Sequence, residues 1–347
     1  MKKKKTIIIG VIIIVIVLLV IVILAGYRRY RNVTKPNVVT PGQANFSLYI
    51  PTGAGFDQVK DSLYSHGLIT DKKSFEWWAS RKDLPSHVKP GRYLLKDGMN
   101  NKQLCNMLAG GLQTPVRVTF NNMRNVAMLA GRISQQIEAD SIEIVNYLND
   151  PSHLAELGFT QQTIPALFLP NTYEFYWNTN AAQFVEKMKK EYDKYWNEDR
   201  LNQAQEVGLY PIQVSTLASI DDQETNKTDE MARIAGVYLN RLRNGWLLQA
   251  DPTLVFAVGD FELKRVLNVH KEIESPYNTY KYPGLPPGPI CIPSLASINA
   301  VLHAEKHNYY YFCAKEDFSG YHNFAKSLTE HNRNAERYQR ALNKKKN

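Results

Sequence analysis

The sequence predicts an α+β protein with a transmembrane helix at its N-terminus. An almost unbroken run of Ile, Val and Leu fills residues 6–25. Further along, short apolar strands recur, each followed by a turn and an amphipathic helix, and from about residue 206 the apolar residues follow helical spacing. These three observations divide the chain into a cytoplasmic tail (1–5), a transmembrane helix (6–26), a linker (27–45) and three folded regions, 46–115, 116–205 and 206–347.

The N-terminal run is long enough to cross a bilayer and follows the four lysines Lys2 to Lys5. The apolar core of a cleaved signal peptide is usually about half as long, and no small-residue cleavage pattern follows Ala25. We therefore expect an uncleaved helix. Arg28, Arg29 and Arg31 lie just after it, so the positive-inside rule gives only a small bias towards a cytoplasmic N-terminus.

The formal net charge of +9 resides in the tails rather than in the folded regions. Eleven positive charges and no acidic residue fall within residues 1–35 and 341–347, which leaves −2 for the remainder. A nucleic-acid-binding protein carries a basic stripe on a folded face. The charge pattern therefore predicts membrane-flanking and solvated tails, and it argues against nucleic acid as a partner.

The three cysteines, Cys105, Cys291 and Cys313, have no CxxC spacing, and an odd number cannot all pair within one chain. The sequence predicts that they are buried apolar fillers. A disulfide between Cys291 and Cys313 remains open for a chain that folds outside the cytoplasm.

Residues 27–45 are polar, contain Pro36, Pro41 and Gly42 and lack helical periodicity, so they predict a linker. Order is expected from Phe46 onwards, in three weakly repeated strand–turn–helix units. The expected strands are 46–50, 92–95 and 116–120, and the apolar helical positions that follow them are 56, 59 and 63, then 104, 107 and 108, then 126, 129 and 133.

The most informative residue is Glu224. Val214, Leu217 and Asp221 have helical spacing, and Glu224 falls one heptad after Leu217 on the same inward side. Partial burial raises the pKa of a carboxyl group, which keeps a glutamate protonated for use as a general acid. By itself, the pattern is more typical of a glutamate that only caps or pairs across a helix end.

A second helix is predicted from the spacing of Met231, Ile234, Tyr238 and Leu242. Thr228 or Asp229 is the candidate N-cap, and Gly245 is the expected stop. Arg241 lies beside the polar side of this helix, where it is interpreted as structural support for the site.

Three sequence blocks accompany Glu224: "ASIDDQET" at 218–225, "YLNRLRNGWLLQADPT" at 238–253 and "SPYNTYKYPGLPPGPI" at 275–290. Together they resemble the endolytic murein transglycosylase, or YceG-like, family, and the resemblance runs from Phe46 to His331. The first two strand–helix units, including "PGRYLL" at 90–95, resemble the LysM-like part of that family, and "LFLPNTYEFY" at 167–176 resembles its substrate-channel motif.

The chain departs from the family pattern at three places. Asn171 replaces an Asp of the channel motif, and Asn121-Asn122-Met123 replaces a Pro-Glu-Gly. Family roles at these positions are therefore not carried over. Asp221 also stands where an apolar residue is usual.

The resemblance implies a fold with a LysM-like βα subdomain followed by a mixed α/β catalytic domain, and it implies an endolytic lytic transglycosylase. Glu224 would protonate the glycosidic oxygen between N-acetylmuramic acid and N-acetylglucosamine, and would then take the proton of the muramoyl C6 hydroxyl as that oxygen attacks C1. The product is a 1,6-anhydro end, and the cut contributes to the termination of glycan elongation. Ordinary glycosidases need two carboxylates, whereas this reaction needs one and no cofactor.

Candidate substrate-binding residues flank this glutamate. Gln249 and Asp251 either hydrogen-bond sugar hydroxyls or hold the tyrosine-rich loop, and the two alternatives are equally supported. Tyr277 and Tyr280 either stack on pyranose rings or are half-buried structural tyrosines. Asn278, Thr279 and Tyr173 complete the set that the resemblance implies.

Other chemistries lack their usual motifs. His303 and His307, with Glu305 between them, have i, i+4 spacing on an expected helix, but the order is not H-E-x-x-H and no third ligand is evident, so ordinary exposed histidines are predicted and no metal site. No Gly-x-Ser-x-Gly, Walker or Gly-x-Gly-x-x-Gly motif is present.

The resemblance further implies a protein of the cell inner (plasma) membrane, single-pass with its N-terminus cytoplasmic and its catalytic region periplasmic. The expected partners are peptidoglycan glycan strands and peptidoglycan synthases. An alternative from another class is a non-catalytic, membrane-anchored glycan-binding scaffold of the cell-wall synthesis machinery, which has lost turnover through the departures at Asp221 and Asn171. Retention of Glu224 argues against it.

Overall fold

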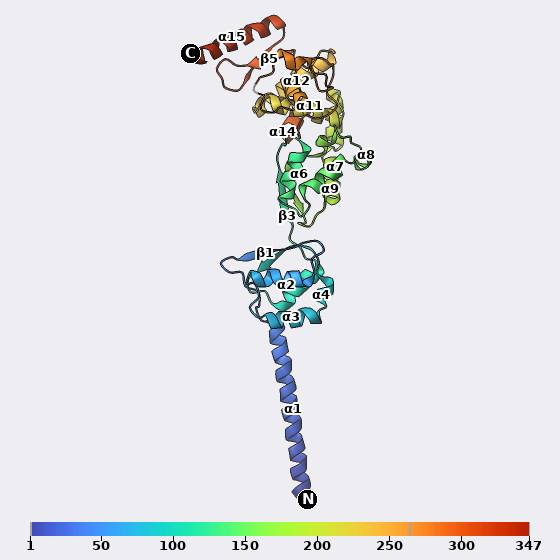
Figure 1. The fold of residues 1–347 in the computed structure, drawn as a ribbon, viewed down its shortest axis with the longest axis vertical. Coiled ribbons are helices and arrows are strands. Elements are labelled where there is room, and N and C mark those ends of the chain that lie inside the picture. The colour runs from blue at the N-terminus through green and yellow to red at the C-terminus, as the bar shows by residue number, and fades with distance from the viewer. Residues whose placement is uncertain (1, 264, 347) are drawn as a thin grey trace. The chain divides into compact units, whose positions relative to one another are not determined.

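The computed structural model describes residues 2–263 and 265–346 (Figure 1). The chain divides into two compact units, one made of Met1–Val116 with Glu174–Asn178 and the other of Arg117–Tyr173 with Thr179–Asn347. Each unit contains both helices and strands, so the α+β class is confirmed.

A single long helix, α1 (Lys2–Thr34), opens the first unit. Its large apolar side chains from Ile7 to Leu24 are exposed, and the span Lys3–Thr34 is long and apolar enough to cross a membrane. A signal sequence would pass the same test of length and composition. The helix is therefore compatible with a single-pass anchor.

The structure differs from the predicted linker at 27–45. The helix α1 continues to Thr34, and its end packs on the rest of the unit, where Val33 is buried and the carbonyl of Asn32 accepts a hydrogen bond from Asn101. Beyond it, Val38 is fully buried. The polar composition of this segment does not predict these contacts, because their partners are more than thirty positions away in the sequence.

The body of the first unit is a two-stranded antiparallel sheet covered by short helices. Strand β1 (Asn45–Ile50) pairs with β2 (Gly91–Lys96) in a register that sets Leu48 opposite Tyr93. The helices are α2 (Phe56–Ser65), α3 (Lys72–Arg81), α4 (Leu84–His87) and α5 (Asn101–Gly110). Both strands, α2 and α5 coincide with the sequence prediction, whereas α3 and α4 have no predicted counterpart.

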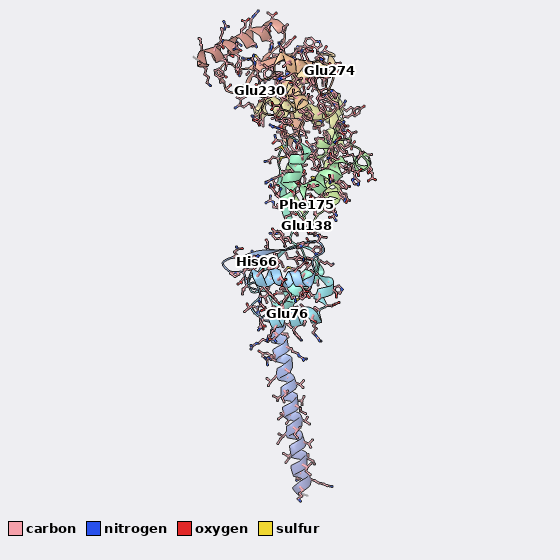
Figure 2. The ribbon with its side chains drawn as sticks, viewed as in Figure 1. His66, Glu76, Glu138, Phe175, Glu230 and Glu274 are labelled. Atoms are coloured by element: carbon pink, nitrogen blue, oxygen red, sulfur yellow. The ribbon has the colours of Figure 1, made fainter. Side chains whose placement is uncertain are left out.

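Alternating burial explains why the two strands form. Leu48 and Ile50 of β1 and Tyr93 and Leu95 of β2 are all buried, and they share one core with apolar residues of the helices. Polar contacts link the helices at the surface, where Tyr64 of α2 donates a hydrogen bond to Glu76 of α3 at 2.8 Å (Figure 2).

The second unit contains most residues of a two-stranded sheet formed by β3 (Val116–Phe120) and β4 (Asn171–Phe175), where the hydroxyls of Thr119 and Thr172 lie 2.8 Å apart. The helices in its first half are α6 (Val126–Ser134), α7 (Ser141–Asn149), α8 (Pro151–Leu157), the 3₁₀ helix η1 (Ile164–Leu167), α9 (Ala181–Tyr195) and α10 (Glu198–Val207).

The second half of this unit is built around α11 (Pro211–Glu224), which is buried continuously from Val214 to Asp221. It is followed by α12 (Thr228–Arg243), α13 (Asp251–Val258), the 3₁₀ helix η2 (Asn268–Glu272), α14 (Leu295–Leu302), the hairpin of β5 (Tyr311–Ala314) and β6 (His322–Ala325), and α15 (Leu328–Lys346). A helix that is covered all round is a core helix, and α11 is packed by α12, α13 and α14.

One predicted helix boundary is wrong. The N-cap of α12 is Lys227 and not Thr228 or Asp229, so both of those residues already lie in the first turn. Just before the helix, the hydroxyl of Thr225 accepts a hydrogen bond from the Lys227 amide at 3.0 Å, which closes a local turn. The predicted stop is close, since the helix ends at Arg243 and Gly245 has a φ of +67°.

The loop after η2 is fixed by a close backbone approach at Gly288. A Cβ atom there would lie 2.0 Å from the carbonyl oxygen of Gln162. We expect Gly288→Ala to displace the loop and to lower the free energy of unfolding by about 1–3 kcal/mol. Chemical denaturation of the full chain in detergent measures this change.

The matched control is Gly131→Ala in α6, where nothing lies within 4 Å of the new Cβ. That variant is expected to gain about 0.5–1 kcal/mol, because alanine favours a helix interior over glycine. Equal effects of the two substitutions would contradict the proposed close approach.

Candidate active site

Glu224 is the last residue of α11, at the point where the buried helix reaches a cavity. Its Oε1 atom accepts a hydrogen bond of 2.6 Å from the hydroxyl of Tyr238, which projects from α12. Tyr238 is itself buried, and its ring meets Phe312 of β5 edge-on. The glutamate is therefore held by a short, oriented contact.

The environment raises the pKa of the Glu224 carboxyl group from 4.5 to about 7. Burial is the main cause, and the negative charge of Asp251 adds to it. The hydrogen bond from Tyr238 and the positive charge of Arg241 act in the opposite direction. A carboxyl group with this pKa can both give and take a proton near neutral pH.

A first cavity, of about 440 Å³, includes Glu224 in its wall. Its wall combines α11 and α12 with the β5–β6 hairpin and the start of α15. The side chains that line this cavity include Glu224, Tyr238, Arg241, Gln249, Asp251, Tyr280, Cys313, His322 and His331.

A second cavity, of about 740 Å³, shares Glu224 and Asp251 with the first. Its remaining wall includes Arg124, Phe261 and Tyr338. The guanidinium of Arg124 stacks over the ring of Phe261 at 4.6 Å. Glu224 thus lines two polar cavities.

Three of the predicted substrate-binding residues line the first cavity together with Glu224. The hydroxyl of Tyr280 donates to the Asp251 carboxylate at 2.6 Å. Gln249 adopts a φ of +51°, and its backbone amide donates to the backbone carbonyl of Thr279 at 3.0 Å. Gln249 and Asp251 thus hold the tyrosine-rich loop in place, and both side chains are also exposed to the cavity.

Asn278 and Thr279 are buried, and their polar groups are used inside the loop. The amide of Asn278 donates to the carbonyls of Lys271 and Ile273, and the hydroxyl of Thr279 accepts from the amide of Ala250. We therefore assign both residues to loop structure and not to sugar contact.

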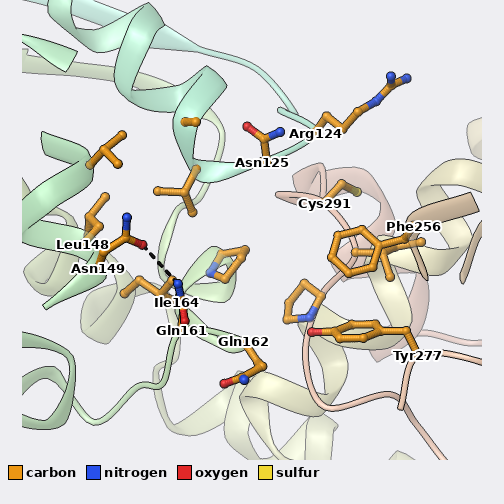
Figure 3. A pocket seen from close by; sticks show the side chains of 16 residues that line it. Arg124, Asn125, Leu148, Asn149, Gln161, Gln162, Ile164, Phe256, Tyr277 and Cys291 are labelled. Carbon is orange, nitrogen blue, oxygen red and sulfur yellow. Dashed lines mark hydrogen bonds between the residues drawn. The ribbon is translucent and has the colours of Figure 1, made fainter. Parts of the chain in front are cut away.

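Tyr277 and Tyr173 lie away from the first cavity. Tyr277 packs on Phe256 with ring centroids 4.6 Å apart, and both line a third cavity of about 240 Å³ beside Cys291, as Figure 3 shows. Tyr173 stacks on Phe120, and its hydroxyl donates to the carbonyl of Leu169 at 2.7 Å.

Arg241 has the supporting position expected for it. The buried guanidinium donates to the carbonyls of Tyr310 and Leu248 at 2.7 and 2.6 Å, and so ties α12 to the strands and loop around the cavity. It also places a positive charge near Glu224.

Asp222 has a role in a polar network rather than in the cavities. Its carboxylate accepts hydrogen bonds from Ser294 at 2.6 Å and from Asn122 at 3.0 Å. Asn122 belongs to the Asn-Asn-Met segment that departs from the family pattern. In this chain, that segment therefore helps to hold the end of α11.

The prediction that His303 and His307 lie together on one helix is wrong. The helix α14 ends at Leu302, so His303 caps it and His307 lies in the following loop, where its Nε2 contacts the carbonyl of Arg233. The two rings therefore do not share a helix face. Within the described residues, no group of three or more His, Cys, Asp or Glu side chains is arranged to hold a metal ion.

The cysteines are free thiols, so the open possibility of a Cys291–Cys313 disulfide is not realised in the structure. Cys105 and Cys291 are buried, as predicted, whereas Cys313 is half-buried on β5. Burial raises the pKa of the Cys105 and Cys291 thiols to about 12.

Sequence reasoning missed Tyr238, His322 and His331 as cavity residues. Tyr238 falls on the apolar stripe of α12, and periodicity alone assigns such a residue to the core. The two histidines come from the hairpin and α15, roughly one hundred residues after Glu224. Only the "GYHNF" and "TEHN" segments in which they lie could have marked them.

Comparison with known proteins places these features in context. The model of the YceG-like family matches residues 48–337. A protein named endolytic murein transglycosylase from Bacillus subtilis (strain 168) is 28% identical over 315 residues, which are 86% of this chain and 86% of that protein.

The protein of the same name from Streptococcus pneumoniae serotype 2 (strain D39 / NCTC 7466) is 26% identical over 343 residues, with 89% of this chain covered and 61% of that protein. The chain thus spans about three-fifths of the pneumococcal relative. A crystal structure of a yceG-like protein from Listeria monocytogenes matches with a TM-score of 0.55 at 26% identity, over 84% of this chain and 98% of that one.

Proposed function

The chain belongs to the YceG-like family, and from this premise we propose that it is an endolytic murein transglycosylase, a lyase that cuts peptidoglycan glycan strands. The observation that carries the proposal is the carboxyl group of Glu224, which has a pKa of about 7 and lines two cavities. The relatives supply the substrate class through their names.

In the proposed reaction, Glu224 acts first as an acid and then as a base. It gives its proton to the oxygen of the bond between N-acetylmuramic acid and N-acetylglucosamine, and that bond breaks. The carboxylate then takes the proton of the muramoyl C6 hydroxyl while that oxygen attacks C1. The hydroxyl of Tyr238 holds the same carboxyl group throughout, and no water is consumed.

The two cavities support an internal cut. We propose that a glycan strand occupies both cavities, so that several of its sugars are bound near Glu224 and neither end of the strand is needed for binding. We propose that Gln249, Asp251 and Tyr280 contact the sugar in the first cavity. Asn278 and Thr279 support the loop that carries Tyr280.

For the rest of the chain, we propose that residues 46–115 act as a LysM-like subdomain that contacts glycan, that 116–205 form an intermediate channel region and that 206–347 form the catalytic domain. The enzyme would contribute to termination of glycan elongation beside peptidoglycan synthases.

We expect the N-terminus to be cytoplasmic and the body to lie outside the plasma membrane, because Lys2 to Lys5 precede the apolar run. Protease added to protoplasts or spheroplasts should remove the body of the chain and leave an N-terminal fragment. A chain that stays whole until the membrane is opened would contradict this orientation.

The products distinguish this mechanism from hydrolysis. We expect purified, uncrosslinked glycan strands to be cut internally to fragments with 1,6-anhydro ends, each lighter than the hydrolytic product by one water, with no loss of activity after chelation. Mass spectrometry of the fragment ends measures this. Mainly reducing ends would rule out the transglycosylase mechanism, and strands that bind without being cut would favour the non-catalytic scaffold.

A further inference from the structure

A buried carboxylate orients a histidine in the wall of the first cavity. Glu230 lies in the first turn of α12 (Figure 2) and is 4% exposed. It accepts one hydrogen bond from the backbone amide of His322 at 3.0 Å and a second from the Nδ1 atom of the same residue at 2.8 Å. These two contacts fix both the start of β6 and the plane of the imidazole ring.

The contact with Glu230 also fixes the chemistry of the ring. A carboxylate can only accept, so Nδ1 carries a hydrogen, and the Nε2 atom of a neutral ring is then an acceptor. Phe312 packs edge-on against the ring, with centroids 5.3 Å apart. Across the described residues, the structure records no hydrogen bond to Nε2, and His322 lines the cavity that contains Glu224.

We propose that Nε2 of His322 accepts a hydrogen bond from a hydroxyl group of the sugar bound in the first cavity. His322 is then a substrate-binding residue, and Glu230 is a positioning residue that acts through it. The inference rests on the proposed function, because it takes the ligand of the cavity to be a glycan strand.

A purely structural role would need the bond between Nδ1 and Glu230, but it would not need Nε2 as an acceptor. The bond between Nδ1 and Glu230 ties the hairpin to α12, and a tie does not require an acceptor on the opposite side of the ring. Two substitutions separate the roles of Nδ1 and Nε2. The amide nitrogen of asparagine can replace Nδ1 as a donor to Glu230, whereas the longer side chain of glutamine brings an amide oxygen near the position of Nε2.

The test uses the full chain in detergent with Glu224→Gln present, so that strands are bound but not cut. The probe is soluble, uncrosslinked glycan strand freed of stem peptides, and calorimetry measures its affinity. We expect His322→Asn to keep the melting temperature and to lower affinity about fivefold to tenfold, the effect of one lost hydrogen bond. His322→Gln is expected to bind more tightly than His322→Asn.

The matched control is His153→Asn, which changes another histidine that lies beside a carboxylate, 3.9 Å from Asp150, outside the cavities. It should bind like the parent. In the chain with Glu224 intact, His322→Asn should raise KM more than it lowers kcat. Parental affinity for His322→Asn would overturn the proposal.

These outcomes are separable from the proposed function. If the parent chain cuts no strand but binds it, the transglycosylase activity fails while the role of His322 is still decided by the affinities. If strands are cut normally and His322→Asn binds like the parent, only the present inference fails.

Discussion

Glu224→Gln is expected to lower the rate of glycan cleavage about a hundredfold or more, because glutamine keeps the shape of the side chain and removes proton transfer. The hydrogen bond from Tyr238 can persist to the amide oxygen, so the variant should fold and still bind strands. The assay counts new 1,6-anhydro ends per enzyme over time. Cleavage at the parental rate would mean that another group, with Asp251 the first candidate, is the acid.

The stability of the same variant provides an internal check. The pKa of Glu224 is about 7 in the folded chain against an ordinary value of 4.5. Since the folded pKa is the higher one, the unfolded chain releases this proton first, and stability falls as pH rises between these two values. Glutamine does not ionise, so Glu224→Gln avoids this fall in stability and should have a higher melting temperature than the parent at pH 7. A lower melting temperature would point to damage rather than to lost chemistry.

Asp221→Asn is expected to stabilise the protein at neutral pH. Asp221 is fully buried in α11, and within the described residues neither of its carboxylate oxygens has a hydrogen-bond partner. Burial raises the pKa of this group well above its ordinary value, and the nearby charges of Glu224 and Asp222 add to the effect. The folded chain therefore keeps a proton that the unfolded chain releases above about pH 4.

The direction in which stability changes with pH follows from the pKa of Asp221, which is higher in the folded chain than in the unfolded chain. Each pH unit between the unfolded and the folded pKa costs up to about 1.4 kcal/mol, so stability falls as pH rises through that window. Asparagine does not ionise, and Asp221→Asn should be more stable than the parent at pH 7 by on the order of 2 kcal/mol and little changed at pH 4. Thermal unfolding followed at both pH values measures the difference.

Asp222→Asn is the matched control, one residue along the same helix. Its carboxylate is hydrogen-bonded to Ser294 and Asn122, so its neutralisation should not raise stability at pH 7. An unchanged pH dependence in Asp221→Asn would show that the buried carboxyl group does not carry this proton.

The contrast between these two aspartates shows what the sequence could predict. Helical spacing predicts that Val214, Leu217 and Asp221 are buried in one helix, and the structure agrees, although it buries every residue from Val214 to Asp221 and not one side alone. Whether a buried carboxyl group is paired depends on residues far away in the chain. Asn122 and Ser294 could not be assigned to Asp222 from spacing.

Contacts between distant parts of the chain were also beyond prediction around the first cavity. The three blocks that carry the family resemblance supply Glu224, Gln249, Asp251 and Tyr280, which the fold brings together. His322 and Glu230 are 92 positions apart, and only the packing of the hairpin on α12 reveals their contact. Boundaries that rest on single residues, such as the N-cap of α12 and the end of α14, were equally beyond a local pattern.

The buried thiols have a practical consequence for measurements on this protein. Thiol-reactive dyes attack the thiolate, so Cys105 and Cys291, which are buried and have a pKa of about 12, should label slowly. Cys313 alone needs replacement, by serine. A dye attached through Gln339→Cys, at an exposed position of α15 that borders the second cavity, would then report the arrival of a strand by a change in fluorescence, without any alteration of Glu224.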